Sequence, residues 1–225
     1  MGWKKAGSWS TIVRGRGYFD AQYMYDEVGL EGGDLPFDFK AFMADPTPFF
    51  IQSVRADTGE TVTFTREDLR SPEDIMFFVR ASSTMPGFMV MPRRDGISYV
   101  DGALGYTGGI PIQPLIDAGF SRFAVLLTRP RGFRRVPPRF PSGLRVLFRS
   151  YPAVAEAMIK RHERYNASLD TVERLAREGR AQVFYPERML VTNRERNPEK
   201  IRENYREGER QAAAEWDSWR AFLGL

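Results

Sequence analysis

The sequence predicts an α/β protein whose mostly parallel sheet is covered by helices on both sides. Short runs typical of strands alternate with longer segments of helical periodicity, which is the pattern of this class. Residues 123–127, "FAVLL", are continuously apolar, as in a strand that is buried on both faces of a parallel sheet. Residues 152–177 repeat apolar side chains every three or four positions, which predicts a long helix.

The first half of the chain predicts strands and helices in alternation. We expect a short helix at 37–45, strands at 49–54 and 61–64, a helix that begins at 72, and a strand at 97–100. Asp57-Thr58-Gly59 has the chemistry of a turn between the first two strands. Ser71 can cap the second helix, where Pro72 fits the first helical position. The last strand of this half leads directly to Asp101.

The second half predicts fewer and longer elements. We expect a short helix from about 114 to 119, a strand at 123–127, an irregular loop with a short helix over 129–149, the long helix, a strand at 181–186, and a last helix that begins at 197. By the rule that open parallel sheets bind ligands beyond the carboxyl ends of their strands, Asp101 lies where a site is expected.

Composition excludes several kinds of chemistry. The 225 residues contain no cysteine and a single histidine, His162. Disulfides, thiolate metal sites and a cysteine nucleophile are therefore excluded, and a histidine-rich metal site is not possible. We predict no cofactor and no metal. No stretch approaches the roughly 18 apolar residues of a membrane-spanning helix, and the first residues lack a signal pattern, so we expect a cytoplasmic location with contact at a membrane surface as an addition.

The basic residues are concentrated in one segment. Residues 129–149 hold seven arginines and no acid, although the whole chain has a formal net charge of only +4. The segment can be a solvated loop, a contact for an anionic lipid surface, or a contact for nucleic acid. We favour these in that order, and nucleic acid is disfavoured. The arginines expected at a membrane surface are Arg131, Arg134, Arg135 and Arg139.

The stretch "YVDGALGYTGGIP", residues 99–111, places one acid among glycines and small apolar residues. Asp101 can hold a turn by accepting hydrogen bonds from backbone amides, or it can act as a general base. Ser82 and Ser83 lack the glycines that sharpen a nucleophile elbow, so we interpret them as structural hydroxyls. His162 lies in a charged helical segment and is interpreted as a solvated or interhelical residue.

Four segments, "RASSTMPGFM", "YVDGALG", "FAVLLTRPRGFRR" and "RHERYNASLDTVERLAREGRAQVFYPE", together resemble bacterial patatin-like phospholipases. The resemblance runs from about residue 35 to beyond 200. It implies a three-layer α/β/α sandwich with C-terminal helices and the hydrolysis of lipid or other acyl esters by a Ser-Asp dyad. In that family the aspartate comes from an Asp-Gly-Gly or Asp-Gly-Ala motif, and the position that matches it is Asp101.

The chain departs from the family's pattern in three places. It contains no Gly-x-Ser-x-Gly and no Gly-Gly-Gly-x-Arg-Gly-like loop, and "GYTGG" is longer than the usual turn after the aspartate. We therefore expect a patatin-like domain that is incomplete at its N-terminus, with the serine before Met1 and no activity in this chain alone. The alternative is a non-catalytic protein that associates with a membrane surface or a partner.

These expectations divide the chain into three parts. Residues 1–35 form an irregular N-terminal segment, residues 36–190 form the C-terminal part of a patatin-like domain, and residues 191–225 form a helical tail. The last part contains several aromatic side chains, which are more often packing surface than lipid anchors.

Overall fold

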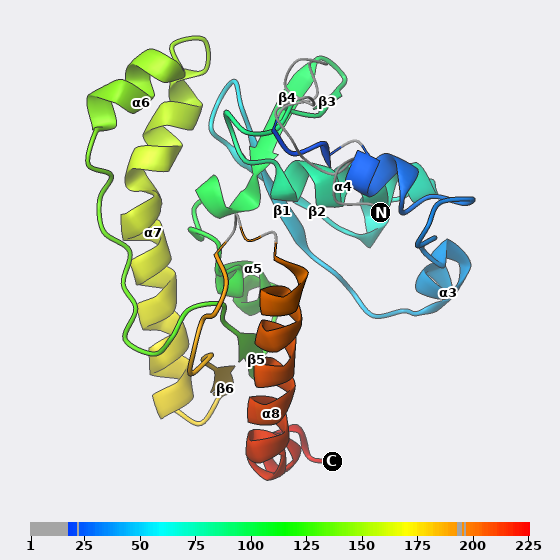
Figure 1. The fold of residues 1–225 in the computed structure, drawn as a ribbon, viewed down its shortest axis with the longest axis vertical. Coiled ribbons are helices and arrows are strands. Elements are labelled where there is room, and N and C mark those ends of the chain that lie inside the picture. Colours follow the sequence, from blue (N-terminus) through cyan, green and yellow to red (C-terminus); the bar gives the residue numbers. More distant parts are fainter. Residues whose placement is uncertain (1–17, 22, 193–194, 196) are drawn as a thin grey trace.

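The computed structural model describes residues 18–21, 23–192, 195 and 197–225, and these form a mixed α/β fold (Figure 1). In chain order the elements are η1 (Tyr23–Glu27), α3 (Phe39–Ala44), β1 (Ile51–Arg55), β2 (Thr61–Phe64), η2 (Arg66–Asp68), α4 (Pro72–Ser83), β3 (Arg93–Arg94), β4 (Ile97–Asp101), η3 (Gly102–Leu104), α5 (Ile112–Asp117), β5 (Phe123–Leu126), α6 (Pro141–Leu147), α7 (Pro152–Arg177), β6 (Ala181–Phe184) and α8 (Pro198–Leu223). The predicted α/β class is confirmed. Residues 1–17 of the N-terminal segment lie outside the described residues.

The sheet that carries Asp101 is antiparallel. Its strand order is β2-β1-β4-β3, and each neighbouring pair runs in opposite directions. Two of these pairs are hairpins, closed by the turn at 57–59 and by Asp95-Gly96, and a hairpin makes its strands antiparallel. Among the described strands only β5 and β6 pair in parallel. The expectation of a mostly parallel sheet is wrong for these residues, and the carboxyl-end rule does not apply to this sheet.

Helices cover both faces of the four-stranded sheet. On one face, α4 packs Phe78 against Phe64 and Tyr99 of the strands. On the other face, the first half of α7 contacts Val54 and Val100. The helix α4 begins where the sequence predicts, because Ser71 and Asp74 form a reciprocal capping box around Pro72. The four-stranded sheet is thus the middle layer between two layers of helix.

The second half of α7 packs on the two-stranded sheet. Its side chains Tyr165, Leu169, Val172 and Leu175 are buried in one cluster with Phe123 of β5 and Ala181 of β6. The opposite face of β5 is not covered, and Leu126 is 73% exposed. The prediction that this strand is buried on both faces is therefore wrong. A continuous apolar run does not show whether helices cover one face of the strand or both, and here a helix layer covers only one face of β5.

The last helix, α8, packs along the segment that follows β6. The amide of Gln211 donates a hydrogen bond to the Tyr185 carbonyl at 2.8 Å and accepts one from the Glu187 backbone at 3.0 Å. Trp219 is buried on the same helix. Figure 1 shows α7 and α8 as the two long helices, with α5, β5 and β6 between them in this view. In the part of the chain that the structure describes, every helix is too short or too polar to cross a bilayer.

Candidate functional site

Asp101 is the last residue of β4 and the N-cap of the short helix η3. Its carboxylate accepts a hydrogen bond from the Ala103 backbone N–H at 2.8 Å, and its own N–H donates to the Thr84 carbonyl at 2.9 Å. The side chain is half-buried and forms no ion pair with any residue that the structure describes. Asp101 therefore caps a turn through one carboxylate oxygen, and the other oxygen accepts no hydrogen bond from a described residue.

The surroundings of Asp101 raise the pKa of its carboxyl above the ordinary value. Burial raises the pKa of this carboxyl, and the Ala103 hydrogen bond and the charges of Arg161 and Arg135 only partly offset the rise. A carboxylate with a raised pKa holds a captured proton more strongly than an exposed one, which is what a general base for a hydroxyl requires.

The glycines after Asp101 are required by close backbone contacts. A Cβ atom on Gly102 would lie 2.1 Å from the carbonyl oxygen of Gln52 on β1, so no other residue fits without moving the strand. Gly108 has a φ of +64°, and a Cβ there would lie 2.2 Å from the backbone nitrogen of Tyr165 on α7. The long "GYTGG" turn therefore lets the loop after Asp101 lie directly on helix α7.

Helix α7 also holds this loop by hydrogen bonding and brings two arginines near Asp101. Arg164 donates a hydrogen bond to the Leu104 carbonyl of η3 at 2.6 Å. Burial lowers the pKa of Arg161, which Asp101 partly offsets. Burial also lowers the pKa of Arg135, and the positive charge of Arg161 lowers it further. The Nε atoms of Arg135 and Arg161 are buried without a hydrogen-bond partner among the described residues.

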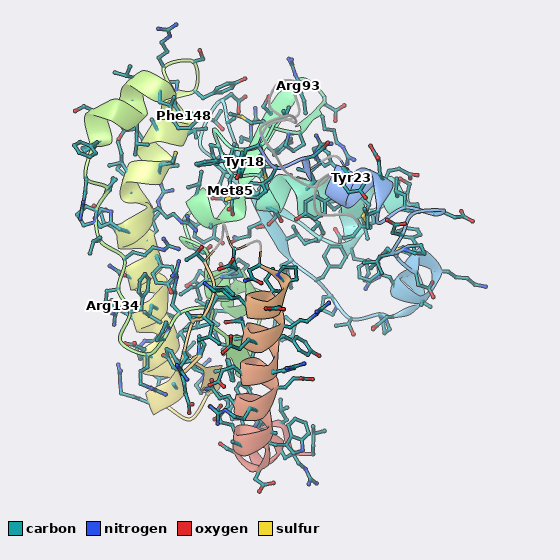
Figure 2. The ribbon with its side chains drawn as sticks, viewed as in Figure 1. Tyr18, Tyr23, Met85, Arg93, Arg134 and Phe148 are labelled. Atoms are coloured by element: carbon teal, nitrogen blue, oxygen red, sulfur yellow. The ribbon has the colours of Figure 1, made fainter. Side chains whose placement is uncertain are left out.

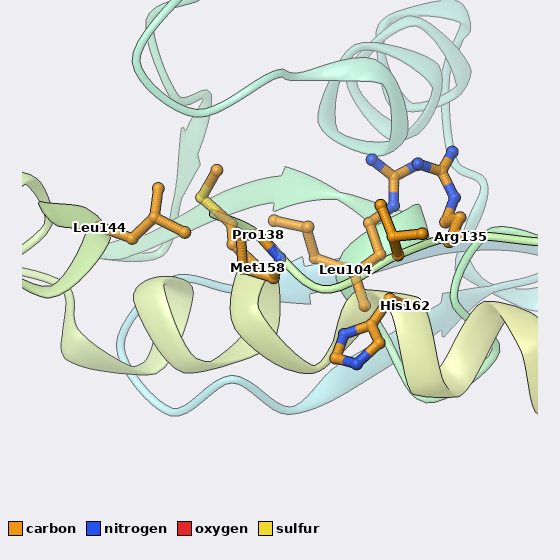
Figure 3. Close-up of a pocket in the computed structure, with 8 residues that line it drawn as sticks. Leu104, Arg135, Pro138, Leu144, Met158 and His162 are labelled. Carbon is orange, nitrogen blue, oxygen red and sulfur yellow. The ribbon is translucent and has the colours of Figure 1, made fainter. Parts of the chain in front are cut away.

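A cavity of about 300 Å³ lies beside these arginines, between α7, α6 and the loop that joins β5 to α6. We call it the α7 cavity. Arg135, Arg161 and His162 line it together with the apolar side chains of Leu104, Val136, Pro138, Leu144 and Met158. Figure 3 shows Arg135 at one end and Leu144 at the other, so the cavity has a cationic end and an apolar end.

The four arginines expected at a membrane surface have different roles in the structure. Arg134, which is labelled beside α7 in Figure 2, forms ion pairs with Asp170 and Glu173 of that helix. Arg131 stacks on the Tyr185 ring with its guanidinium carbon 4.3 Å from the ring centre. Arg135 is half-buried and lines the α7 cavity. Of the four, Arg139 is exposed and forms no ion pair with a described residue.

The serines of this region have structural surroundings. Ser82 and Ser83 are half-buried in the last turn of α4. Ser53 lies opposite Asp101 in the β1–β4 register, but its hydroxyl is fully buried and donates to the Val100 carbonyl at 2.8 Å. These placements argue against Ser53 as the nucleophile that Asp101 would activate.

The sequence reasoning missed Arg161, although a signal was present. The apolar stripe of α7 includes Val154, Met158, Tyr165 and Leu169, and its helical spacing places position 161 on the same face. A positively charged residue on the apolar face of a helix is expected to be at least partly buried, so this pattern predicts a buried charge at Arg161. His162 is half-buried, lines the cavity and hydrogen-bonds the Ile159 carbonyl at 2.9 Å, so it is neither fully solvated nor isolated.

Two family profiles match the chain, and the residues that line the α7 cavity come from both matched regions and from the segment between them. Residues 1–116 match the profile of the patatin-like phospholipases, and residues 151–224 match a domain of unknown function (DUF6363). A search of curated proteins finds no match to this chain. Asp101 lies in the first matched region and Arg161 in the second, whereas Arg135 lies between them.

The matched profile and the α/β fold place this protein in a lipid hydrolase family, and the members of that family act on lipid esters. Because the profile covers more than half of the residues, the chain belongs to the patatin-like phospholipase family.

Proposed function

We propose that this chain is part of a patatin-like lipid acyl hydrolase and that Asp101 is its general base. The observation that supports this most directly is the state of the carboxylate. Asp101 is half-buried, is not held in an ion pair with a described residue, and uses its single backbone hydrogen bond to fix its direction. Burial raises its pKa toward the range in which a carboxylate is an effective base.

The partner of Asp101 is a serine that these 225 residues do not supply. The sequence has no Gly-x-Ser-x-Gly, and the serines near Asp101 have the structural surroundings described above. We infer that polypeptide outside these residues brings the serine and the oxyanion-stabilising glycines to the end of β4. A dyad needs no histidine, which is consistent with His162 lining the cavity rather than contacting Asp101.

The proposed reaction has two steps. In the first step Asp101 takes the serine proton while the serine oxygen attacks the ester carbonyl, and Asp101 then gives that proton to the departing alkoxide. In the second step Asp101 takes a proton from water, the hydroxide attacks the acyl-enzyme, and the serine leaves with the proton from Asp101. The products are a carboxylic acid and an alcohol.

The test compares Asp101→Asn with an unchanged enzyme. Asparagine can still accept the Ala103 hydrogen bond, so the turn is kept while the base is lost. We expect the 225-residue chain to hydrolyse no p-nitrophenyl butyrate. A protein that also carries a preceding Gly-x-Ser-x-Gly segment, read in frame from the genomic sequence before the Met1 codon, should hydrolyse it. Asp101→Asn should reduce that rate by a factor of at least about 100.

Asp95→Asn is the matched control, because Asp95 is an exposed aspartate in the β3–β4 hairpin. Its φ of +50° is one that asparagine also adopts readily. We expect this variant to keep the full rate. Equal rates for Asp101→Asn and Asp95→Asn would exclude Asp101 as the base, and a stop codon directly before the Met1 codon would favour a non-catalytic role.

We propose membrane-surface association as a second function, because apolar and basic side chains are exposed together in residues 136–149. We call these residues the basic apolar segment. Val136 and Phe140 are 79% and 78% exposed, and Val146 and Leu147 are also largely exposed. The exposed arginines of the segment include Arg139 and Arg149, whereas Arg145 is paired with Glu156. Apolar side chains surrounded by cations fit an anionic lipid surface.

Vesicle flotation tests this second function. We expect the chain to float with vesicles that contain phosphatidylglycerol and to remain behind with purely zwitterionic vesicles. Phe140→Ser should weaken the binding, and salt should weaken it further, because each basic side chain near an anionic bilayer contributes about 1 kcal/mol. Phe120→Ser is the control, an exposed phenylalanine outside the segment. Equal binding of both variants would contradict the assignment, and preferential binding to RNA would favour a nucleic-acid contact.

A further inference from the structure

The α7 cavity combines a cationic end with an apolar body. Arg135 lies at its charged end, and the walls toward Leu144 are apolar (Figure 3). Arg161 also lines the cavity and lies close enough to Arg135 for the two charges to interact. Val136 lines the cavity and is largely exposed, so the cavity opens at the surface. Sites for small ligands have this composition, with mostly apolar walls and a few converging polar groups.

The two guanidinium groups at the charged end lack acceptors. Among the described residues neither group takes part in a hydrogen bond or an ion pair, and the Nε atom of each is buried. The guanidinium carbon of Arg135 lies 4.8 Å from the centre of the Tyr165 ring, and the Asp101 carboxylate also stabilises its positive charge. Half-buried cations whose Nε atoms lack acceptors carry a desolvation cost, and an anionic group bound beside them would lower that cost.

We propose that the α7 cavity binds a single-chain carboxylate. Its carboxylate group accepts hydrogen bonds from Arg135 and Arg161, and its hydrocarbon chain lies along Met158 toward Leu144. Paired guanidinium groups match the geometry of a carboxylate, whose two oxygens each accept from a separate donor.

The local charge and the size of the cavity select this class of ligand. Arg135, Arg161 and the nearby Arg129 contribute three positive charges and Asp101 one negative charge, so the group is net positive and favours an anionic ligand. A volume of about 300 Å³ is at the lower end of the range for ligand sites, which fits one hydrocarbon chain.

This inference goes beyond the proposed function and does not depend on it. Binding of the carboxylate requires no serine and no proton transfer, so it is measurable on the 225-residue chain. It concerns residues on α7 and on the loop before α6, whereas the proposed base lies on β4. Failure of one proposal therefore leaves the other standing.

Isothermal titration calorimetry on the unchanged chain is the first test, because it needs no variant that could fail to fold. The probes are octanoate, octan-1-ol and acetate, which separate the charged group from the hydrocarbon chain. We expect octanoate to saturate a single site and the other two to bind at least about tenfold more weakly, the factor of about one charge-assisted hydrogen bond. Octyl phosphate tests in the same titration whether the site prefers a doubly charged head group.

Variants then assign the binding to the two arginines. Arg135→Gln and Arg161→Gln should each weaken octanoate binding by about tenfold. Arg139→Gln is the matched control, an exposed arginine of the same loop that does not line the cavity, and its affinity should change by less than about twofold. Circular dichroism of each variant checks that the fold is kept.

Each alternative result overturns the proposal in a defined way. Equal affinity for octan-1-ol and octanoate would show that the arginines do not select an anion. Tighter binding of octyl phosphate would exclude a singly charged group as the preferred one. Binding that does not saturate, or that is equally strong in Arg135→Gln and Arg139→Gln, would place the ligand outside the α7 cavity.

Discussion

The two halves of helix α7 pack against different sheets with side chains of different size. The first half contacts the four-stranded sheet through Val154, Ala155 and Ala157, which are small and let the helix backbone approach closely. The second half contacts the two-stranded sheet through large side chains, among them Leu169. The residues between the halves are mostly polar, and they include Arg161. The half-buried Arg161 therefore lies where the interface of α7 with the four-stranded sheet ends and its interface with the two-stranded sheet begins.

Truncation in the second half should have the largest effect on stability. Leu169 is 2% exposed among large neighbours, so Leu169→Ala removes buried surface and leaves a cavity. We expect it to lower the free energy of unfolding by about 2–5 kcal/mol, measured by urea denaturation. Val146→Ala is the control at a largely exposed site, where we expect a change within about 0.5 kcal/mol. Similar losses in both variants would show that α7 is not packed as described.

Enlargement in the first half should have a smaller effect of a different kind. Ala155 is fully buried where α7 meets the four-stranded sheet, so Ala155→Leu adds volume with no space to receive it. We expect a loss of about 1–3 kcal/mol by urea denaturation. Ala167→Leu is the control on the exposed side of the same helix. A stabilising Ala155→Leu would mean that the first half of α7 does not approach the four-stranded sheet closely.

The ionisation of Asp101, which lies near Arg161 of α7, should have the smallest effect on stability, visible as a pH dependence of the free energy of unfolding. The pKa of Asp101 is raised in the folded state above its ordinary value of 3.8, so the folded protein holds this proton to higher pH than the unfolded chain. As pH rises above 3.8, the unchanged protein should therefore lose stability relative to Asp101→Asn, until Asp101 is fully ionised. Urea denaturation at several pH values measures this difference. A difference that grows in the opposite direction would mean that the carboxylate is held by a cation.

Much of this fold could be predicted from local sequence patterns. The strand at Thr61–Phe64, the capped start of α4 at Pro72 and the end of α7 at Arg177 are confirmed. The errors concern relations between strands. The apolar run at β5 correctly indicates a parallel strand. The error lies in expecting the same direction for the strands of the other sheet, which hairpins join in antiparallel pairs. Apolar periodicity reports burial and carries no information on strand direction.

The site was predictable to the extent that it lies in one motif. Asp101 is half-buried at the end of its strand, as the motif suggested, and its role as a base stays a prediction. The half-buried position of Arg135 was not predictable, because its sequence neighbours in the basic segment are mostly exposed arginines and only the fold places it against the α7 cavity. Arg161 could be recognised only by placing it on the apolar stripe of its helix.

The unbroken course of α7 has a consequence for how this protein can change. An α-helix turns by about 100° per residue, so an insertion or deletion of one residue between the halves would rotate one half relative to the other by that angle. The small side chains would then leave their sheet while Leu169 and its neighbours stayed on theirs. Homologous chains should therefore keep the number of residues over 159–164 constant, while residue type varies at exposed positions such as Lys160 and Glu163.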